Sequence, residues 1–531
     1  MTSFNVVVAT DLTAESLDLL KNAKGVTTTT VTPTLAALKP HLKTAHALIV
    51  RDDILVDSAL MDAAPSLKIV ACVSISLNNV DLETATSRGI LVMNTPGVSA
   101  IAAGEHTLAL MLALSRRLVS AHNSLKEGYW LLDRSRQVGV QLVGKTIGLI
   151  GLGRVGTVVA MRCLGFGMNV LAYDPYVSEE LVTDQRIQLV GLRELLGRSD
   201  FVSVHVPSTR ETQGMIGADV IAQMKAGARL INTAHGSIVD EHALADAVKT
   251  GHLAGVAVDV YKDIPPYNNP LIGMDNVIHT PHIGDNTVEA MQDLSARVVE
   301  QVVDALRDVD YRNVVNMPLL PGVDYDTIRP YMHLAQCMGT VVFTLARSPI
   351  QRVAVQVNGD EMAGLIKPIS VGFLHGLLLP IMGESVSAIN APFLATERGW
   401  RISQAKGLPT GEYSSNVTCE VTLEDGEKIT IGGTLLDRRE PHIVQINQYR
   451  MNFIPEGYLL LMGSYDRPGV IGKVGTLLSE RKVNIASWHT GRTEPGGNTL
   501  TLLALDEPIP DDVLTELRAL DFVRHAHQMK I

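Results

Sequence analysis

Short apolar runs alternate with segments of helical spacing from residue 4 to about residue 306. Apolar residues fall every three or four positions in 14–21 and 287–306, as in amphipathic helices, and a longer helix rich in Ala and Leu is expected at 101–115. Alternating strands and helices predict a parallel sheet with helices on both faces. The runs expected to form strands are 4–9, 47–50, 67–72, 201–206, 229–232, 255–260 and 277–280.

The pattern changes after the segment Pro-Leu-Leu-Pro-Gly at 318–322. A helix is expected at 326–345, followed by alternating strands such as 350–357 and 417–423. From about residue 458 the order is strand, helix, strand, strand, helix and strand, which is typical of a ferredoxin-like module. Its elements are expected at 458–463, 471–480, 483–492, 499–505 and 511–520, with a final strand after them.

One segment carries the strongest chemical signal. The apolar run 147–150 leads directly into Gly151-Leu-Gly-Arg-Val-Gly156, and a helical pattern follows at 157–164. A second apolar run, 169–173, then stops at Asp174. Strand, glycine turn, helix, strand and acid follow one another in the order and length that a dinucleotide site requires.

The glycines of this segment have separate roles in such a site. Gly151 permits the tight turn, Gly153 lets the backbone approach a pyrophosphate, and Gly156 lets helix and strand pack closely. The helix N-terminus supplies amide groups and partial positive charge. Asp174 stands where a carboxylate binds the ribose hydroxyls and repels an additional phosphate, so the segment predicts a site that favours NAD over NADP.

Composition narrows the class of protein. The 531 residues carry a net charge of −11, which argues against nonspecific binding to nucleic acid or to an acidic membrane. No segment comes near the ~18 uninterrupted apolar residues of a membrane span, and we expect no signal peptide. The four cysteines lie far apart without a CxxC pair, so we expect no metal site and a reduced, cytoplasmic location.

Further motifs point to a known family. The middle region contains Asn390-Ala-Pro-Phe-Leu-Ala-Thr-Glu-Arg-Gly399, and the last region contains Asp466-Arg-Pro-Gly-Val-Ile-Gly472 and Asn484-Ile-Ala486. Over essentially its full length the chain resembles the long-form D-3-phosphoglycerate dehydrogenases of the D-2-hydroxyacid dehydrogenase superfamily. Other motifs that carry the resemblance are Asn79-Val-Asp81-Leu, Asn94-Thr-Pro-Gly97, His205-Val-Pro207, Ile231-Asn-Thr-Ala234, Ile238-Val-Asp-Glu241 and Thr280-Pro-His-Ile-Gly284.

The resemblance implies an α/β fold. A Rossmann-type nucleotide domain would be inserted in a flavodoxin-like substrate domain, followed by an intervening α+β domain and a C-terminal ferredoxin-like ACT domain. The implied boundaries are 1–97 and 288–316 for the substrate-binding domain, 98–287 for the NAD-binding domain, 317–453 for the intervening domain and 454–531 for the ACT regulatory domain.

The resemblance also implies an activity: NAD-dependent oxidation of 3-phospho-D-glycerate to 3-phosphohydroxypyruvate, the first step of L-serine biosynthesis. It implies a homotetramer or homodimer, a small anionic hydroxy or keto acid as substrate, and an amino-acid effector bound at Ser464, Asp466 and Asn484 of the ACT domain. The cofactor positions are Gly151, Gly153, Arg154, Val155, Gly156, Asp174, Val206, Thr233, Ala234, Asp259, His282 and Gly284. The substrate positions are Arg51, Ser74, Ser99 and His235.

The catalytic groups depart from the family pattern. Oxidising a 2-hydroxy acid needs a base for the hydroxyl proton, a carboxylate beside that base, and an arginine for the substrate carboxylate. His282 matches the family histidine. His235 replaces the arginine and Ile264 replaces the glutamate, so we expect protonated His235 to bind the carboxylate and Asp263, one residue earlier, to stand in for the glutamate.

A third departure is Ser74-Ile-Ser76, where the family has a Gly-x-Gly loop. Cys72 also stands where members often carry an arginine for the substrate phosphate, although Arg51 keeps another such position. Three interpretations follow: a working phosphoglycerate dehydrogenase, a relative acting on a different 2-hydroxy or 2-keto acid, or a catalytically impaired subunit that binds NAD or an amino acid.

Overall fold

The computed structural model describes every residue except 1–2, 52–53, 75–76, 131–136, 183, 320–323, 360–361, 363, 408–412, 414 and 438. The chain forms two compact units. The first comprises 1–11, 17–94 and 298–531, and the second comprises 12–16 and 95–297. The chain returns from the second unit to the first within helix α11 (Val288–Leu306). The expected boundaries of the four domains stay a prediction.

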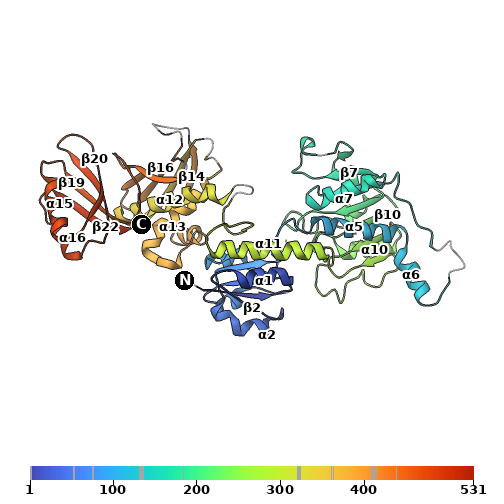
Figure 1. The fold of residues 1–531 in the computed structure, drawn as a ribbon. Coiled ribbons are helices and arrows are strands. Elements are labelled where there is room, and N and C mark those ends of the chain that lie inside the picture. The colour runs from blue at the N-terminus through green and yellow to red at the C-terminus, as the bar shows by residue number, and fades with distance from the viewer. Residues whose placement is uncertain are drawn as a thin grey trace. The chain divides into compact units, whose positions relative to one another are not determined.

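The first unit begins with a five-stranded parallel sheet, blue in Figure 1. Its order, β2-β1-β3-β4-β5, is that of flavodoxin-like folds. β3 and β4 are buried at every position, as expected for parallel strands covered on both faces. The elements are β1 (Phe4–Ala9), α1 (Ala14–Asn22), β2 (Val26–Thr30), α2 (Leu35–Leu38), β3 (Ala47–Val50), α3 (Ser58–Asp62), β4 (Ile69–Cys72), α4 (Leu82–Ser87) and β5 (Leu91–Met93).

The second unit is built on a seven-stranded parallel sheet of order β12-β11-β10-β9-β6-β7-β8. β6 comes first in the sequence and pairs with both β7 and β9, so the order of the strands reverses between β6 and β9. Ligands of such sheets bind outside the carboxyl ends of the strands at this point. The strands are β6 (Thr146–Ile150), β7 (Asn169–Tyr173), β8 (Ile187–Leu189), β9 (Phe201–Val204), β10 (Ala228–Asn232), β11 (Leu253–Val258) and β12 (Val277–His279).

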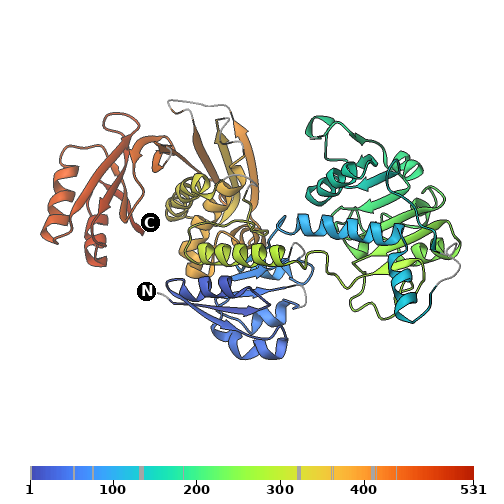
Figure 2. The ribbon, with the colours of Figure 1, turned by 45° about the vertical axis from the view of Figure 1, so that its right-hand side comes forward.

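Helices cover both faces of this sheet (Figures 1 and 2). α5 (Ala100–Ser115) and α7 (Arg154–Gly165) contribute Met111 and Val159 to the apolar cluster on one face. α8 (Leu192–Arg198), α9 (Ala218–Ile221) and α10 (Glu241–Lys249) contribute to the cluster on the other face. α6 (Leu118–Lys126) follows α5. The predicted alternation of strands and helices is therefore a doubly covered parallel sheet.

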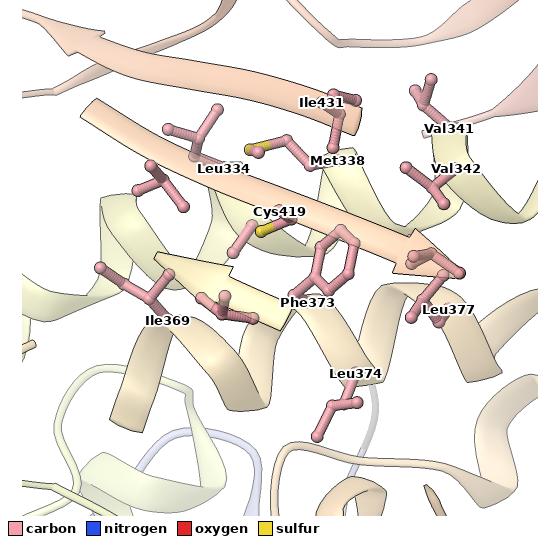
Figure 3. Close-up of a cluster of buried hydrophobic side chains, with 14 of the residues drawn as sticks. Leu334, Met338, Val341, Val342, Ile369, Phe373, Leu374, Leu377, Cys419 and Ile431 are labelled. Carbon is pink, nitrogen blue, oxygen red and sulfur yellow. The ribbon is translucent and has the colours of Figure 1, made fainter. Parts of the chain in front are cut away.

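The chain then forms a six-stranded sheet of order β14-β13-β15-β16-β17-β18, in which only β13 and β14 pair in parallel. Figure 3 shows Met338 of α12 and Phe373 of α13 beside Cys419 and Ile431 of the sheet. The elements are α12 (Tyr325–Leu345), β13 (Ile350–Asn358), α13 (Ile366–Met382), α14 (Ala391–Glu397), β14 (Arg401–Gly407), β15 (Asn416–Leu423), β16 (Lys428–Leu436), β17 (Glu440–Ile446) and β18 (Tyr449–Phe453).

Glycines bring the backbones of α12 and α13 into direct contact. A Cβ placed on Gly376 would lie 1.9 Å from Gln336 O, and one on Gly339 would lie 2.3 Å from Phe373 O. Thr340 Oγ1 donates a hydrogen bond to Gly376 O, with an O–O distance of 3.3 Å. Only residues without a side chain permit this approach.

The segment Ile366–Ser385 is long and apolar enough to cross a membrane by length and composition, with a mean hydropathy of 1.4. The sequence predicted no membrane span here, because the apolar stretch is interrupted by polar residues. Phe373 and Leu377 are nevertheless fully buried in the apolar cluster shared with α12 and the sheet. We therefore assign α13 to the protein core.

The last region is a four-stranded antiparallel sheet of order β20-β21-β19-β22 with two helices, as the ferredoxin-like pattern predicted. α15 and α16 cover one face. On the opposite face, Leu461 and Leu502 join the apolar cluster of the six-stranded region. The elements are β19 (Tyr458–Tyr465), α15 (Val470–Glu480), β20 (Ile485–Arg492), β21 (Asn498–Leu505), α16 (Asp511–Arg518) and β22 (Val523–Lys530).

Candidate active site

The glycine turn lies where the order of the strands in the seven-stranded sheet reverses. Gly151 has a φ of +100°, and a Cβ there would lie 2.6 Å from His205 O. A Cβ on Gly156 would lie 2.2 Å from Gly151 O, so this glycine lets α7 begin directly against the turn. A Cβ on Gly153 would meet nothing within 4 Å. The open side of the turn is thus at Gly153, the N-cap of α7, where a pyrophosphate fits.

Asp174 follows β7, the strand beside β6, and is bonded to this turn. Its Oδ2 accepts a hydrogen bond from Leu152 N at 2.9 Å, and its Oδ1 accepts one from Tyr176 N at 3.0 Å. The carboxylate is half-buried. It therefore stands beside the open side of the turn with a negative charge, which fits the ribose hydroxyls of NAD.

Arg154 and Val155 begin α7 beside the same turn. The guanidinium of Arg154 lies over Gly97, because a Cβ on that glycine would be 1.9 Å from Arg154 Nη1. Val206 follows β9, and its Cγ1 would be 2.9 Å from a Cβ on Gly151. The residues that follow β6 and those that follow β9 are thus in contact at the glycine turn.

The β10 strand leads into the turn that carries Thr233, Ala234 and His235. Buried Asn232 holds this turn: its Oδ1 accepts a hydrogen bond from Ala234 N at 3.1 Å, and its Nδ2 donates one to His235 O at 2.9 Å. Thr233 Oγ1 lies 2.7 Å from Thr107 Oγ1 of α5. The sequence motif contains Asn232, but its structural role was not predicted.

The β12 strand leads into the loop Thr280–Gly284, which carries His282. His282 is exposed and has a φ of +56°, a left-handed conformation that is unfavourable for a residue with a side chain. Asp259, at the end of β11, holds the loop. His282 N donates to Asp259 O at 2.9 Å, Ile283 N donates to Oδ1 at 3.0 Å, and Gly284 N donates to Oδ2 at 2.8 Å.

The electrostatics of the site act on His235. Burial, and then the charge of His282, lower the pKa of His235 below its usual value of 6.5. His235 is therefore largely neutral at neutral pH when no ligand is bound. An arginine at this position would be charged at any physiological pH.

The expected stand-in carboxylate, Asp263, is exposed, and Ile264 is 70% exposed. The carboxylate bonded to this loop is Glu241, whose Oε1 accepts a hydrogen bond from Lys262 N at 3.1 Å. The role of Asp263 stays a prediction.

The other expected substrate residues divide between the two units. Arg51 and Ser74 follow the adjacent strands β3 and β4 at the carboxyl edge of the five-stranded sheet, and both are half-buried. Ile75 and Ser76 lie outside the described residues. Ser99 is buried in the second unit as the N-cap residue of α5.

The expected effector residues lie at two ends of the four-stranded sheet of the last region. Asp466 follows β19 and accepts hydrogen bonds from Gly496 N at 3.0 Å and Arg492 Nη1 at 3.2 Å. Asn484 precedes β20 and donates to Asp506 Oδ2 at 2.6 Å. The register of β19, β20 and β21 puts these residues at opposite ends of β21, about 30 Å apart along the strand at ~3.3 Å per residue.

Ser464 differs from the other two effector positions. It is 1% exposed, and its Oγ lies 2.7 Å from Thr499 Oγ1. The hydroxyl is thus already bonded inside the sheet. Its role as an effector ligand stays a prediction, as do those of Asp466 and Asn484.

Comparisons with known proteins agree with this geometry. Residues 108–284 match the NAD-binding domain of the D-isomer-specific 2-hydroxyacid dehydrogenases. The structure of D-lactate dehydrogenase from Aquifex aeolicus, complexed with NAD and lactic acid, is 31% identical, has a TM-score of 0.52, and covers 57% of this chain and 96% of that one. A D-lactate dehydrogenase from Treponema pallidum is 28% identical, with a TM-score of 0.52, and covers 59% of this chain and 99% of that one. Fold and site thus define a D-2-hydroxyacid dehydrogenase architecture with an NAD-binding domain.

The remaining regions identify the family within this class of dehydrogenases. Residues 327–447 match the D-3-phosphoglycerate dehydrogenase intervening domain, and residues 458–522 match the ACT domain. The D-3-phosphoglycerate dehydrogenase of Methanocaldococcus jannaschii is 38% identical over 485 residues, 91% of each chain. That of Archaeoglobus fulgidus is 39% identical over 490 residues, 92% of each chain. The chain belongs to the D-3-phosphoglycerate dehydrogenase family.

Proposed function

We propose that this chain catalyses the NAD-dependent oxidation of 3-phospho-D-glycerate to 3-phosphohydroxypyruvate, the first step of L-serine biosynthesis. Similarity to curated D-3-phosphoglycerate dehydrogenases over about nine tenths of the chain supports this substrate. The observation that carries the proposal is the place of His282. It lies at the carboxyl edge of the same parallel sheet that carries the glycine turn and Asp174.

Gly151–Gly156 would hold NAD, which when bound would accept the hydride from C2 of the substrate. His282 takes the proton of the substrate hydroxyl as the hydride leaves C2. His235, once protonated, binds the substrate carboxylate, and Arg51 is a further proposed substrate residue. Ser74 and Ser99 are the other proposed substrate residues, and Thr233, Ala234 and Asp259 would hold the nicotinamide half of the cofactor.

The proposal assigns the missing carboxylate to Asp263. Its side chain is exposed. Ile264, at the position of the family glutamate, can neither accept a hydrogen bond nor stabilise the charged form of a histidine. We therefore propose an enzyme with lower turnover than relatives that retain both the arginine and the glutamate.

We also propose a cytoplasmic homo-oligomer, a dimer or tetramer. α6 and the residues that follow it expose Leu118, Leu125, Tyr129 and Trp130, each at least 59% accessible. A cluster of large apolar side chains on a surface is typical of a protein interface.

Because Asp466 and Asn484 lie at opposite ends of β21, an amino-acid effector that contacts both positions has to lie between the ACT domains of two copies.

Turnover of a panel of keto acids tests the substrate. Phosphohydroxypyruvate, hydroxypyruvate, 2-oxoglutarate and glyoxylate are offered with NADH, and the loss of NADH absorbance is followed. We expect turnover with phosphohydroxypyruvate. Turnover confined to the other acids would assign the chain a different substrate, and NADH binding without any turnover would make it a regulatory subunit.

Restoring the family residues gives a second, independent measurement. His235→Arg adds a permanent cation for the substrate carboxylate, and Ile264→Glu adds a carboxylate at the position the family uses. We expect each change to raise kcat/KM for phosphohydroxypyruvate about tenfold, the effect of one charge-assisted hydrogen bond of ~1.5 kcal/mol. A double variant no faster than the natural chain would contradict the assigned positions.

A further inference from the structure

His106, in the middle of α5, contacts the loop that presents His282. Its Nε2 lies 3.1 Å from Thr280 Oγ1 and 3.4 Å from Asp259 Oδ1. The His106 side chain is 16% exposed and that of Asp259 is 2% exposed. His106 is part of neither the glycine turn nor the catalytic positions discussed above, so it has no assigned role so far.

The hydrogen-bond geometry fixes which atom carries each proton. Thr280 Oγ1 lies 2.6 Å from Asp259 Oδ1, and an ionised carboxylate can only accept, so the threonine hydroxyl donates its one proton there. The hydroxyl is then left to accept from His106. His106 Nε2 therefore carries a proton and points it at Thr280 and Asp259.

Asp259 is ionised in this setting. Burial raises its pKa, but hydrogen bonds from His106, Thr280 and Ile283 N–H outweigh burial and bring the pKa below its usual value. A buried carboxylate is stable only when donors surround it. Removing His106 takes away one of these donors and frees the Thr280 hydroxyl to rotate away.

The loop needs this support because His282 is held in the left-handed region. A side chain there costs roughly 1–2 kcal/mol, and such a conformation persists only where its surroundings impose it. Asp259 imposes it through three backbone bonds, to His282 N, Ile283 N and Gly284 N. Gly284 leaves room for this arrangement, since a Cβ there would lie 2.9 Å from Asp259 Oδ2.

We propose that His106 is a positioning residue for the reaction. Through Thr280 and Asp259 it holds the 280–284 loop in the conformation that directs His282 at the substrate. The inference rests on the proposed role of His282 as acid and base. It assigns to His106 no contact with substrate or cofactor.

Two variants and one control test it. His106→Leu removes the donor, whereas His106→Gln keeps an Nε2–H at a similar reach. His252→Leu is the control, because this half-buried histidine of the same unit also makes one ring hydrogen bond, to Ile221 O at 3.0 Å, away from the loop. We expect His106→Leu to lower kcat by ~10-fold or more at an unchanged KM for NADH, and His106→Gln to restore most of it.

Hydrogen exchange gives a readout independent of turnover. In the natural chain the Ile283 and Gly284 amides are bonded to a buried carboxylate, so a peptide containing 280–284 is protected. We expect that protection to fall in His106→Leu and to remain in His106→Gln and His252→Leu. Unchanged exchange and kcat in His106→Leu would overturn the inference, as would an equal loss in His252→Leu. If the natural chain is inactive on all substrates, the proposed function is wrong. Hydrogen exchange of the 280–284 peptide would still show whether His106 holds the loop.

Discussion

The Leu152 amide donates a hydrogen bond to the carboxylate of Asp174 at 2.9 Å, joining the glycine turn after β6 to the end of β7. The same carboxylate therefore shapes the turn and places a negative charge where the adenosine ribose of the cofactor would lie. Asp174 therefore has both a structural role in the turn and a proposed role in cofactor binding. A variant that removes only one of these roles can distinguish them.

Asp174→Asn is expected to relax the preference for NAD. Asparagine keeps an oxygen that can accept from Leu152 N–H but loses the charge that repels the additional phosphate of NADP. We expect NADPH to bind at least ~10-fold tighter than to the natural chain, corresponding to ~1.4 kcal/mol, with NADH changed less. Fluorescence titration with both reduced cofactors measures this. Equal affinity of the natural chain for NADPH and NADH would contradict our interpretation of Asp174.

His282→Gln is expected to lower kcat for phosphohydroxypyruvate by ~100-fold or more, since it removes the group that exchanges a proton with the substrate oxygen. Steady-state kinetics provide the measurement. NADH affinity is the control and should change far less than kcat, because the glycine turn is untouched. Normal turnover in this variant would exclude His282 as the acid and base.

Substrate binding is expected to depend on pH through His235. Its pKa is lowered by burial and by His282, so the ring is neutral above the usual value of 6.5 and has to gain a proton to bind a carboxylate. KM for phosphohydroxypyruvate should therefore rise as the pH is raised through this range. In His235→Arg the KM should be lower and independent of pH over the same range. A flat profile in the natural chain would show that His235 does not bind the carboxylate.

Gly376→Ala is expected to destabilise the chain. The new Cβ would lie 1.9 Å from Gln336 O, so α12 and α13 have to separate, and overpacking of this kind costs roughly 1–3 kcal/mol. Gly475→Ala in α15 is the matched control, because a Cβ there meets nothing within 4 Å. That change should be neutral or stabilising through helix propensity. Chemical denaturation of both variants measures the difference, and equal stabilities would argue against the close crossing.

His525 is expected to make the fold sensitive to acid. Burial, together with Arg347, His527 and Arg524, lowers its pKa to about 4, whereas the unfolded chain keeps the usual 6.5. Between pH 4 and pH 6.5 the unfolded state binds more protons at His525 than the folded state does. The free energy of unfolding is therefore unaffected by His525 above pH 6.5 and falls as the pH is lowered towards 4. We expect the Tm of His525→Leu to fall less over this range. His122→Leu changes an exposed histidine and should follow the natural chain.

The local elements could be predicted because their signals are local. The run 147–150, the glycine turn and the run 169–173 are strands and a turn in the structure, since a few glycines and continuous apolar residues determine them. Asp174 is at the predicted place because it follows a strand directly. The helix α13 was not singled out, because it is apolar on most sides and shows little periodicity.

The support of the candidate site could not be predicted in the same way. His106 and Thr280 are 174 positions apart, yet their side chains are 3.1 Å from each other. Nothing in the local pattern around His106 distinguishes it from any other half-buried histidine in an apolar helix. Its role follows only from the packing of α5 beside β12.

The sequence by itself determined the alternation of strands and helices, the dinucleotide turn, and the two departures at His235 and Ile264, because each depends on residue types within a short stretch. Only the tertiary structure decided that a buried Asp259 holds the loop of His282, and that the expected effector residues lie at two ends of one sheet. Both depend on which strands become neighbours in the sheets. That is set by burial of apolar surface across the whole chain, which no single segment encodes.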